Sequence, residues 1–270
     1  MAIGDKQWEV LKPAGTDLIS DIDGWQIDNN KAIQRLVGKQ VNGCVLAYVS
    51  ASSVTIGAGS LACTNGAIYK FRENTSTVAA TFSSPDASSW YDIYAVADSA
   101  TATTFTAEAA KVGVSPAGTY TRRVGSVYVD GSQNVTAFKS FGNGLDKYYY
   151  WDVFQNVRSG AFTATGGWTD ISMVSAMPPT ARLSLLNVAG RLGGTTGFRV
   201  NMRTNGITEN DTAENHHAIL EQKGSSSSPN EEQSGRFWQP TDASQIVEVQ
   251  TFGGGLSEFY VSVVGYMDSI

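Results

Sequence analysis

The stretch IVEVQTFGGGLSEFYVSVVGYMDSI, residues 246–270, decides the fold because apolar and polar residues alternate along both of its halves. In the first half Val247 and Val249 fall on one face of an extended chain, and in the second half Phe259 begins a similar alternation. Gly253–Gly255 lie between the halves. We therefore predict two antiparallel strands that pair as a hairpin and close a β-sandwich, so that the sequence ends inside its fold.

A second strand-rich stretch, GWTDISMVSAMPPTARLSLLNVAGRL, covers residues 167–192. It predicts a strand around Trp168, a break at Met177–Pro179 and a further alternating strand that begins at Ala181. Together with the last two strands, this stretch resembles the carboxyl-terminal β-sandwich of tailed-phage fibre proteins.

The middle of the sequence carries a second resemblance, in PAGTYTRRVGSVYVDGSQNVTAFKSFG. This stretch is similar to many phage structural proteins at Pro116, Tyr120, Arg122, Arg123, Gly125, Ser126, Asp130, Asn134 and Phe138. The two resemblances cover residues 116–141 and 166–270. They imply a fibre or spike subunit of a phage head or tail, made in a bacterial cytoplasm, located in the virion and assembled as a homotrimer.

The composition independently indicates a mostly β, turn-rich chain. Hydrophobic residues make up 41% of the 270 residues, charged residues only 16%, and 28 residues are glycine. A chain of this length is typical of two domains. We predict an N-terminal helical arm over residues 1–40, a β-rich middle domain over 41–146 and a jelly-roll-like β-sandwich over 147–270. The last of these is the candidate receptor-binding domain.

Charge, apolar stretches and cysteine content limit the partners and the chemistry expected of this chain. The net charge is −6 and no stripe of Lys and Arg is present, so we expect no nucleic-acid partner. No stretch approaches the length of apolar residues that spans a bilayer, and no signal peptide is recognisable, so we expect no membrane insertion. Cys44 and Cys63 are interpreted as reduced core residues rather than a disulfide. No cofactor is expected.

The N-terminal arm contains the only convincing helix, IDNNKAIQRLVGKQ, with Asp28 as its N-cap and Gly38 as its stop. So short a helix requires a docking surface. That surface is the virion, the other subunits of the trimer or, as an alternative left open, its own domain. The candidate attachment residues are Trp8, Trp25, Ile33, Leu36 and Val37.

The segment LDKYYYW, residues 145–151, joins the two predicted β-domains and is rich in aromatic residues. Alternation along a strand places Tyr148 and Tyr150 on one side and Tyr149 and Trp151 on the other. Aromatic rings can stack on sugars. We favour a domain junction or a subunit interface, because only half of the rings can share one platform.

Residues 205–240 contain the longest region without regular alternation, and loops on a β-scaffold often carry binding sites. Phe237 and Trp238 fall on opposite faces if they lie in a strand, so one of them is exposed. For Trp238 we favour a position in the core of the sandwich over a ligand contact. For the two histidines we favour a solvated strand end over a metal site, because adjacent residues on a strand point to opposite faces. The candidate glycan contacts are Arg236, Phe237, Trp238, His216 and His217.

No motif of nucleophilic, metal or nucleotide chemistry is recognisable. GAGSLA, residues 57–62, matches a dinucleotide fingerprint by letter, but a turn and a strand follow where that fingerprint needs a helix. Three hypotheses remain. The first is a fibre or spike that binds host-surface polysaccharide and other virion proteins, the second a purely structural capsid decoration or fibre connector, and the third a small glycosidase. We do not expect an enzyme, a catalytic residue or a bound metal.

Overall fold

The computed structural model describes residues 41–142, 145–162, 167–192, 197–207, 218–222, 232–253 and 256–270. The described residues form an all-β fold, and every paired strand runs antiparallel to its neighbour. The predicted arm over residues 1–40, with its candidate attachment residues, lies outside the described residues.

Two sheets make up the N-terminal half of the described chain. The first has six strands in the order β1-β4-β9-β7-β8, with β5 also paired to β4, and the second has three strands in the order β2-β3-β6. Their bounds are β1 Val41–Gly43, β2 Leu46–Ser50, β3 Ser53–Ile56, β4 Gly59–Thr64, β5 Tyr69–Asn74, β6 Val78–Thr81, β7 Ser89–Ala97, β8 Thr106–Lys111 and β9 Tyr120–Val129.

The C-terminal half contains two further sheets that face one another in a β-sandwich-like arrangement. One has the order β10-β11-β18-β13-β16 and the other the order β12-β17-β14-β15. The bounds are β10 Phe138–Phe141, β11 Asp146–Arg158, β12 Thr169–Ser172, β13 Leu183–Leu192, β14 Phe198–Thr204, β15 Ala218–Gln222, β16 Glu232–Pro240, β17 Ile246–Phe252 and β18 Leu256–Ser269.

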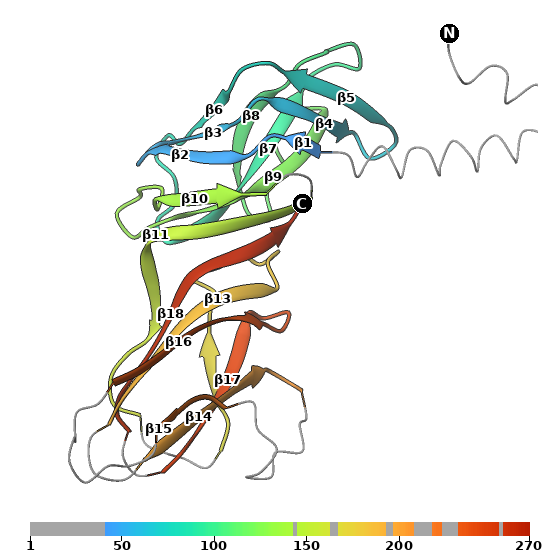
Figure 1. Cartoon of the computed structure of the whole chain (residues 1–270). Helices are drawn as coiled ribbons and strands as arrows, with labels where there is room; N and C mark the ends of the chain where they lie inside the picture. The colour runs from blue at the N-terminus through green and yellow to red at the C-terminus, as the bar shows by residue number, and fades with distance from the viewer. Residues whose placement is uncertain are drawn as a thin grey trace, which may run out of the picture.

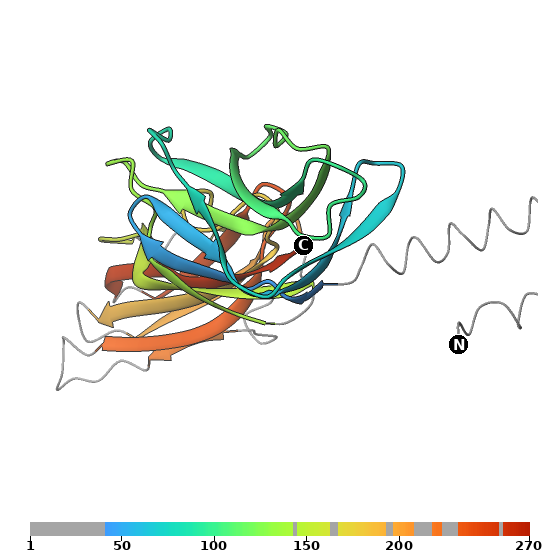
Figure 2. The same ribbon diagram turned by 90° about the horizontal axis from the view of Figure 1, so that it is seen from above.

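The molecule is elongated, with β1–β9 gathered at one end and β12–β17 toward the other (Figure 1). The long strands β11 and β18 run between the two ends, and the C-terminus lies beside the N-terminal half. Seen from above, the strands of that half curve strongly (Figure 2). The division into domains at residue 146 stays a prediction, and β10 on one side of it pairs with β11 on the other.

The predicted hairpin between the last two strands is wrong. Strand β17 pairs with β12 and β14, whereas β18 pairs with β11 and β13, so the two strands belong to facing sheets. Gly253 lies at the end of β17 with φ +89°, and a Cβ there would stand 2.1 Å from the carbonyl oxygen of Gly197. The alternation identified the buried face of each strand correctly, but a buried face does not say which strand lies alongside.

The predicted alternation in β18 is confirmed over its first half, where Phe259, Val261 and Val263 are buried. The register against β13 then shifts by one residue at Val264, as in a β-bulge. Beyond this bulge the strongly buried side chains include Tyr266 and Asp268 at even positions. The bulge therefore moves even-numbered residues onto the face that packs against the N-terminal half.

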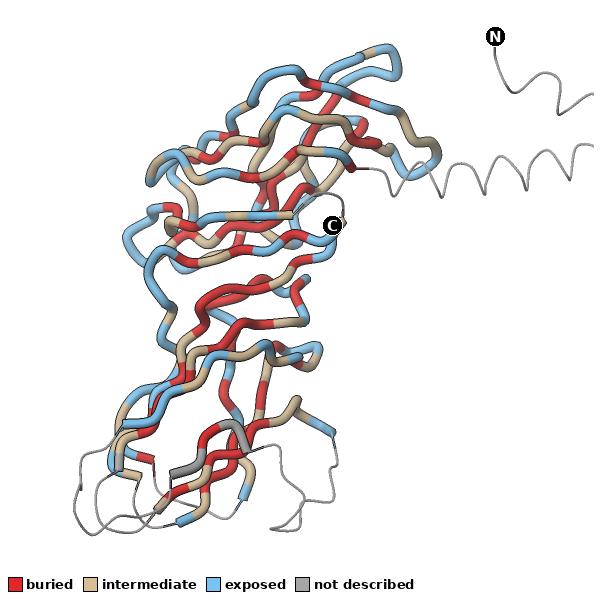
Figure 3. Tube along the Cα trace, viewed as in Figure 1, coloured by how far each residue is buried: buried red, intermediate tan, exposed pale blue. Residues whose placement is uncertain are grey.

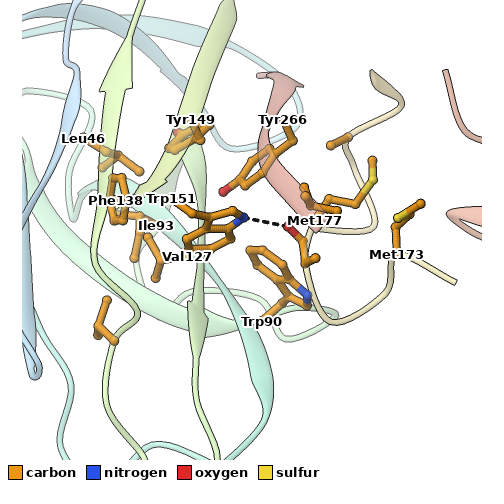
Figure 4. Packing of buried hydrophobic residues seen from close by; sticks show 14 of the residues in the cluster. Leu46, Trp90, Ile93, Val127, Phe138, Tyr149, Trp151, Met173, Met177 and Tyr266 are labelled. Carbon is orange, nitrogen blue, oxygen red and sulfur yellow. Dashed lines mark hydrogen bonds between the residues drawn. The ribbon is translucent and has the colours of Figure 1, made fainter. Parts of the chain in front are cut away.

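One hydrophobic cluster runs through both halves of the molecule, as the buried segments in Figure 3 illustrate. At its centre the rings of Trp90, Trp151 and Tyr266 pack together, with Trp90 and Trp151 centroids 6.0 Å apart (Figure 4). The Trp151 indole N–H donates to the Ala176 carbonyl at 2.9 Å, and the Tyr266 hydroxyl donates to the Ser126 carbonyl at 3.0 Å. These rings therefore join the halves through packing and through satisfied polar atoms.

Cys44 and Cys63 are free and fully buried, as predicted for reduced core residues. Burial raises the pKa of the Cys44 thiol to about 11, although the charge of Lys147 acts in the opposite direction. Burial likewise raises the pKa of Cys63 to about 12, opposed by Arg72 and Arg122. Both thiols therefore stay protonated at neutral pH, which makes them poor nucleophiles.

Candidate binding groove

Strand β11 sends its aromatic residues alternately to the two faces of the five-stranded sheet, which confirms the predicted alternation. Tyr149 and Trp151 point into the core and are almost fully buried, whereas Tyr148 is 36% exposed and Tyr150 is half-buried on the outer face. The strand therefore serves two surfaces at once. Its inner rings form the junction between the halves, and its outer rings are available to a ligand or a partner.

Strand β16 adds a second set of outward side chains. Arg236 and Trp238 lie on the exposed face of the strand, while Phe237 points inward and packs against the core cluster. The prediction that Phe237 and Trp238 occupy opposite faces is confirmed. The favoured core position of Trp238 is wrong, because its side chain lies on the exposed face of the strand. Two of the five candidate glycan contacts therefore share the outer face of the sheet with the rings of β11.

These side chains line an open groove of about 750 Å³ on the outer face of the sheet, which we call the aromatic groove. The backbone register explains why residues distant in sequence meet there. Lys139, Tyr150, Gly265, Leu185 and Trp238 form one row across β10, β11, β18, β13 and β16, a span of about 19 Å at the usual strand spacing. The groove is lined by Lys139, Phe141, Tyr148, Tyr150, Trp151, Asp152, Phe154, Arg236, Trp238 and Val264.

A close strand approach underlies the middle of this row. A Cβ built at Gly265 would stand 2.1 Å from the Tyr149 carbonyl oxygen, so only glycine allows β18 to lie this close to β11. Val264, which forms the bulge just before this glycine, also lines the groove. The bulge and the glycine together shape the floor between the two sets of rings.

The rings of the aromatic groove meet edge to face in pairs. Tyr148 and Trp238 have centroids 5.9 Å apart at 70°, and Phe141 and Tyr150 have centroids 5.5 Å apart at 81°. Phe141 is 53% exposed and Trp238 is 36% exposed. Contiguous exposed rings on a soluble surface usually mark a binding site, and each pair holds its rings in place while leaving part of their surface open.

Three charged side chains accompany these rings. The Arg236 guanidinium carbon lies 5.2 Å from the Phe154 ring centroid, within the range of a cation–π contact. Lys139 and Asp152 are the other two. Within the described part of the chain, neither Arg236 nor Lys139 forms an ion pair. The lining thus carries two positive charges against one negative charge.

Of the other three candidate glycan contacts, the structure describes only Phe237. His216 and His217 lie outside the described residues, and Phe237 does not reach the groove. Lys139, Phe141 and Phe154 line the groove and were missed, although the alternation in FKSF places Lys139 and Phe141 on one face of a strand. What the sequence lacked was the pairing that brings β10, β11 and β16 into one sheet.

Some chemistry requires groups that the described residues do not bring together. Glycoside hydrolysis by two carboxylates needs a pair of them at the site, and the described lining of the groove contains one, Asp152. No cluster of three or more His, Cys, Asp or Glu residues able to hold a metal ion occurs among the described residues. In that same part of the chain no helix is long and apolar enough to cross a membrane.

Comparison with known proteins leaves the family open. No protein-family model matches the chain, and no curated protein matches it. A solved structure titled "Structure of infectious bursal disease virus Gx strain" aligns with 83% of this chain and 65% of its own, at 8% sequence identity and a TM-score of 0.19. The chain therefore spans slightly less than two thirds of that protein, and a likeness this low carries no argument about fold or function.

Proposed function

We propose that the chain is a saccharide-binding subunit of a phage fibre or spike and that the aromatic groove is its binding site. The observation that carries the proposal is the group of outward rings from Tyr148, Tyr150 and Trp238 beside three charged side chains. Sugar rings have an apolar face that covers an aromatic ring well. Polar groups at the edge of such a site fix the orientation of the ligand.

The length of the groove supports an extended ligand. The row from Lys139 to Trp238 crosses five strands, or about 19 Å, which exceeds the size of a single sugar ring. An oligosaccharide segment of a host-surface polysaccharide fits this shape. Attachment of a virion to a host requires such a surface.

The virion assignment rests on the resemblance of residues 116–141 and 166–270 to phage fibre and structural proteins. In this proposal the C-terminal half is a jelly-roll-like sandwich at the distal end of a homotrimer. Residues 1–40 contact other virion proteins. The all-β fold and the elongated outline of the described chain are compatible with a fibre segment.

A second candidate function is a structural connector in which another protein subunit covers the aromatic groove. The observation that favours it is the exposed apolar surface itself, because Phe141, Val153 and Phe154 are all more than 40% exposed and belong to β10 and β11. Subunit interfaces are enriched in such residues. In this alternative the groove is closed in the assembled particle and binds no sugar.

Polysaccharide binding by the full chain tests the proposal. We expect Trp238→Ala to weaken binding to extracted bacterial surface polysaccharide at least tenfold, because loss of a central ring contact costs about 1.4 kcal/mol or more. Phe71→Ala, which removes an exposed ring from β5 of the six-stranded sheet, is the matched control and should leave binding unchanged. Retained binding by Trp238→Ala would place the sugar elsewhere.

Light scattering on the same variants separates the two functions. Three chains of 28.8 kDa form the proposed trimer. If the groove binds sugar, Trp238→Ala keeps the native mass of the unsubstituted protein. If the groove is a subunit interface, that variant dissociates or loses mass, and the connector function is then the better explanation.

A further inference from the structure

The charges of the aromatic groove oppose the charge of the whole protein. The chain carries a formal net charge of −6, yet the groove lining contains Lys139 and Arg236 against Asp152 alone. Neither cation forms an ion pair within the described residues, whereas Lys111, Arg123, Arg191 and Arg203 do. Two cations in one groove of an acidic protein, neither of them paired with a carboxylate among the described residues, favour a ligand that carries negative charge.

Arg236 is prepared for an anion by its contact with Phe154. The guanidinium carbon lies 5.2 Å from the ring centroid, so the ring limits the conformations of a long side chain. A guanidinium held in this way loses less conformational entropy when it forms paired hydrogen bonds with a carboxylate or phosphate. The positive charge is therefore placed before the ligand arrives.

The two cations come from opposite edge strands of the sheet. Lys139 belongs to β10 and Arg236 to β16, with β11, β18 and β13 between them. The Arg236 side chain reaches back to β11, where its guanidinium carbon lies 5.2 Å from the Phe154 ring centroid. Because each cation stands on its own strand, a ligand with one acidic group for each of them gains two charge-assisted contacts, whereas a ligand with a single acidic group gains one.

We propose that the aromatic groove binds an acidic polysaccharide in which carboxylate or phosphate groups recur along the chain. This inference rests on the proposed saccharide-binding function and adds the chemical class of the sugar. In the bound state the sugar rings stack on the aromatic side chains, while two acidic groups of the polymer pair with Lys139 and Arg236. Asp152 accepts hydrogen bonds from sugar hydroxyls at a point between the two cations.

Titration calorimetry of the full chain with matched polymers tests this inference. The probes are polygalacturonate, its fully methyl-esterified form, a panel of acidic and neutral bacterial capsular polysaccharides, and inorganic phosphate. We expect binding in the panel to be confined to acidic polymers. Neutralising the carboxyl groups of a polymer that binds should weaken its affinity at least tenfold. Millimolar phosphate should not displace the bound acidic polymer.

Charge variants test whether the preference for acidic polymers comes from the cations of the aromatic groove. Arg236→Gln and Lys139→Gln should each weaken binding of the acidic polymer about fivefold to tenfold, and Arg236→Lys should recover part of the loss. Lys70→Gln removes the same charge from β5 in the N-terminal half and serves as the control for non-specific attraction. An equal loss in Lys70→Gln would show a diffuse electrostatic effect and overturn the inference.

The outcomes distinguish the inference from the function on which it rests. Equal binding of neutral and acidic polymers, still dependent on Trp238, overturns the acidic preference and leaves saccharide binding intact. Displacement by phosphate as effectively as by polymer overturns both, because it reveals an anion site without sugar recognition. Absence of binding to every polymer in the panel likewise overturns the saccharide function.

Discussion

The two faces of the five-stranded sheet use the same residue types for opposite purposes. On the inner face, Tyr149 and Trp151 are buried against Tyr266, and the Trp151 N–H and Tyr266 hydroxyl both donate to backbone carbonyls. On the outer face, Tyr148 and Tyr150 meet Trp238 and Phe141 edge to face and stay partly open. Aromatic content alone therefore says little about function. Whether a ring packs in the core or stays accessible to a ligand depends on which face of the strand it occupies.

The inner face of this sheet also buries charged side chains, whereas the charged side chains of the outer face are accessible. Arg123 of β9 donates to the Asp92 carboxylate at 2.9 Å and forms a close ion pair with the Asp268 carboxylate of β18, which is fully buried. Burial raises the pKa of Asp268, and the neighbouring Arg123 opposes that change. This network ties the end of the chain to the N-terminal half, whereas Arg236 and Lys139 on the outer face remain available to a ligand.

The largest effect should come from truncating an inner ring. Trp151→Ala should lower the free energy of unfolding by about 3–5 kcal/mol, because it leaves a cavity beside Trp90 and Tyr266. It also removes the donor to the Ala176 carbonyl. Tyr150→Ala, one position earlier on the outer face, should cost about 1 kcal/mol or less. Urea unfolding of both variants measures the difference, and equal losses would contradict the assignment of the two faces.

The buried ion pair should give the next largest effect. Asp268→Ala should destabilise the fold by about 3 kcal/mol, because it deprives the partly buried Arg123 of one of its two carboxylates. Glu258→Ala on the same strand removes the partner of the exposed Arg191, 3.6 Å away, and should cost less than about 1 kcal/mol. If both variants unfold at the same urea concentration, the Asp268 pair does not join the halves as argued.

Local sequence pattern predicted the faces of individual strands but not their neighbours. The opposite faces of Tyr148 and Tyr149 and the opposite directions of Phe237 and Trp238 follow from alternation, which is a property of each strand alone. The pairing of β18 with β13 and of β13 with β16 depends on residues that are distant in sequence. The predicted hairpin is wrong for this reason. Without the strand pairings, the sequence also could not show that Lys139 and Trp238 line one groove.

High pH should weaken the buried core of the N-terminal half before it affects the outer face of the five-stranded sheet. Folding raises the pKa of Cys44 from 9.0 to about 11 and of Cys63 to about 12, mainly through burial. Because the folded state holds these protons more tightly, the stability they contribute is complete below pH 9 and is lost as pH rises toward 11 or 12. Each thiol adds a slope of about 1.4 kcal/mol per pH unit in that window.

Two measurements check this pH dependence. Urea midpoints at pH 8, 9.5 and 10.5 should fall progressively, and Cys63→Ala should fall less steeply than the unsubstituted protein. The buried Tyr149 and Tyr266, whose pKa values are also raised by burial, add to the fall above pH 10 in both proteins. At pH 8 neither thiol should react with a thiol reagent unless urea is added, and rapid labelling of the native protein would contradict the burial.

The smallest effect should come from the ring that holds Arg236. Phe154→Leu keeps an apolar side chain at an exposed position of β11 but removes the π face beneath the guanidinium. Such contacts contribute about 0.5–1 kcal/mol at exposed sites, so affinity for an acidic polysaccharide should fall about twofold to fivefold while the unfolding free energy stays unchanged. In the Arg236→Gln background the same substitution should have no further effect, because the contact is already lost. An additional loss in that double variant would mean that Phe154 touches the ligand itself rather than positioning Arg236.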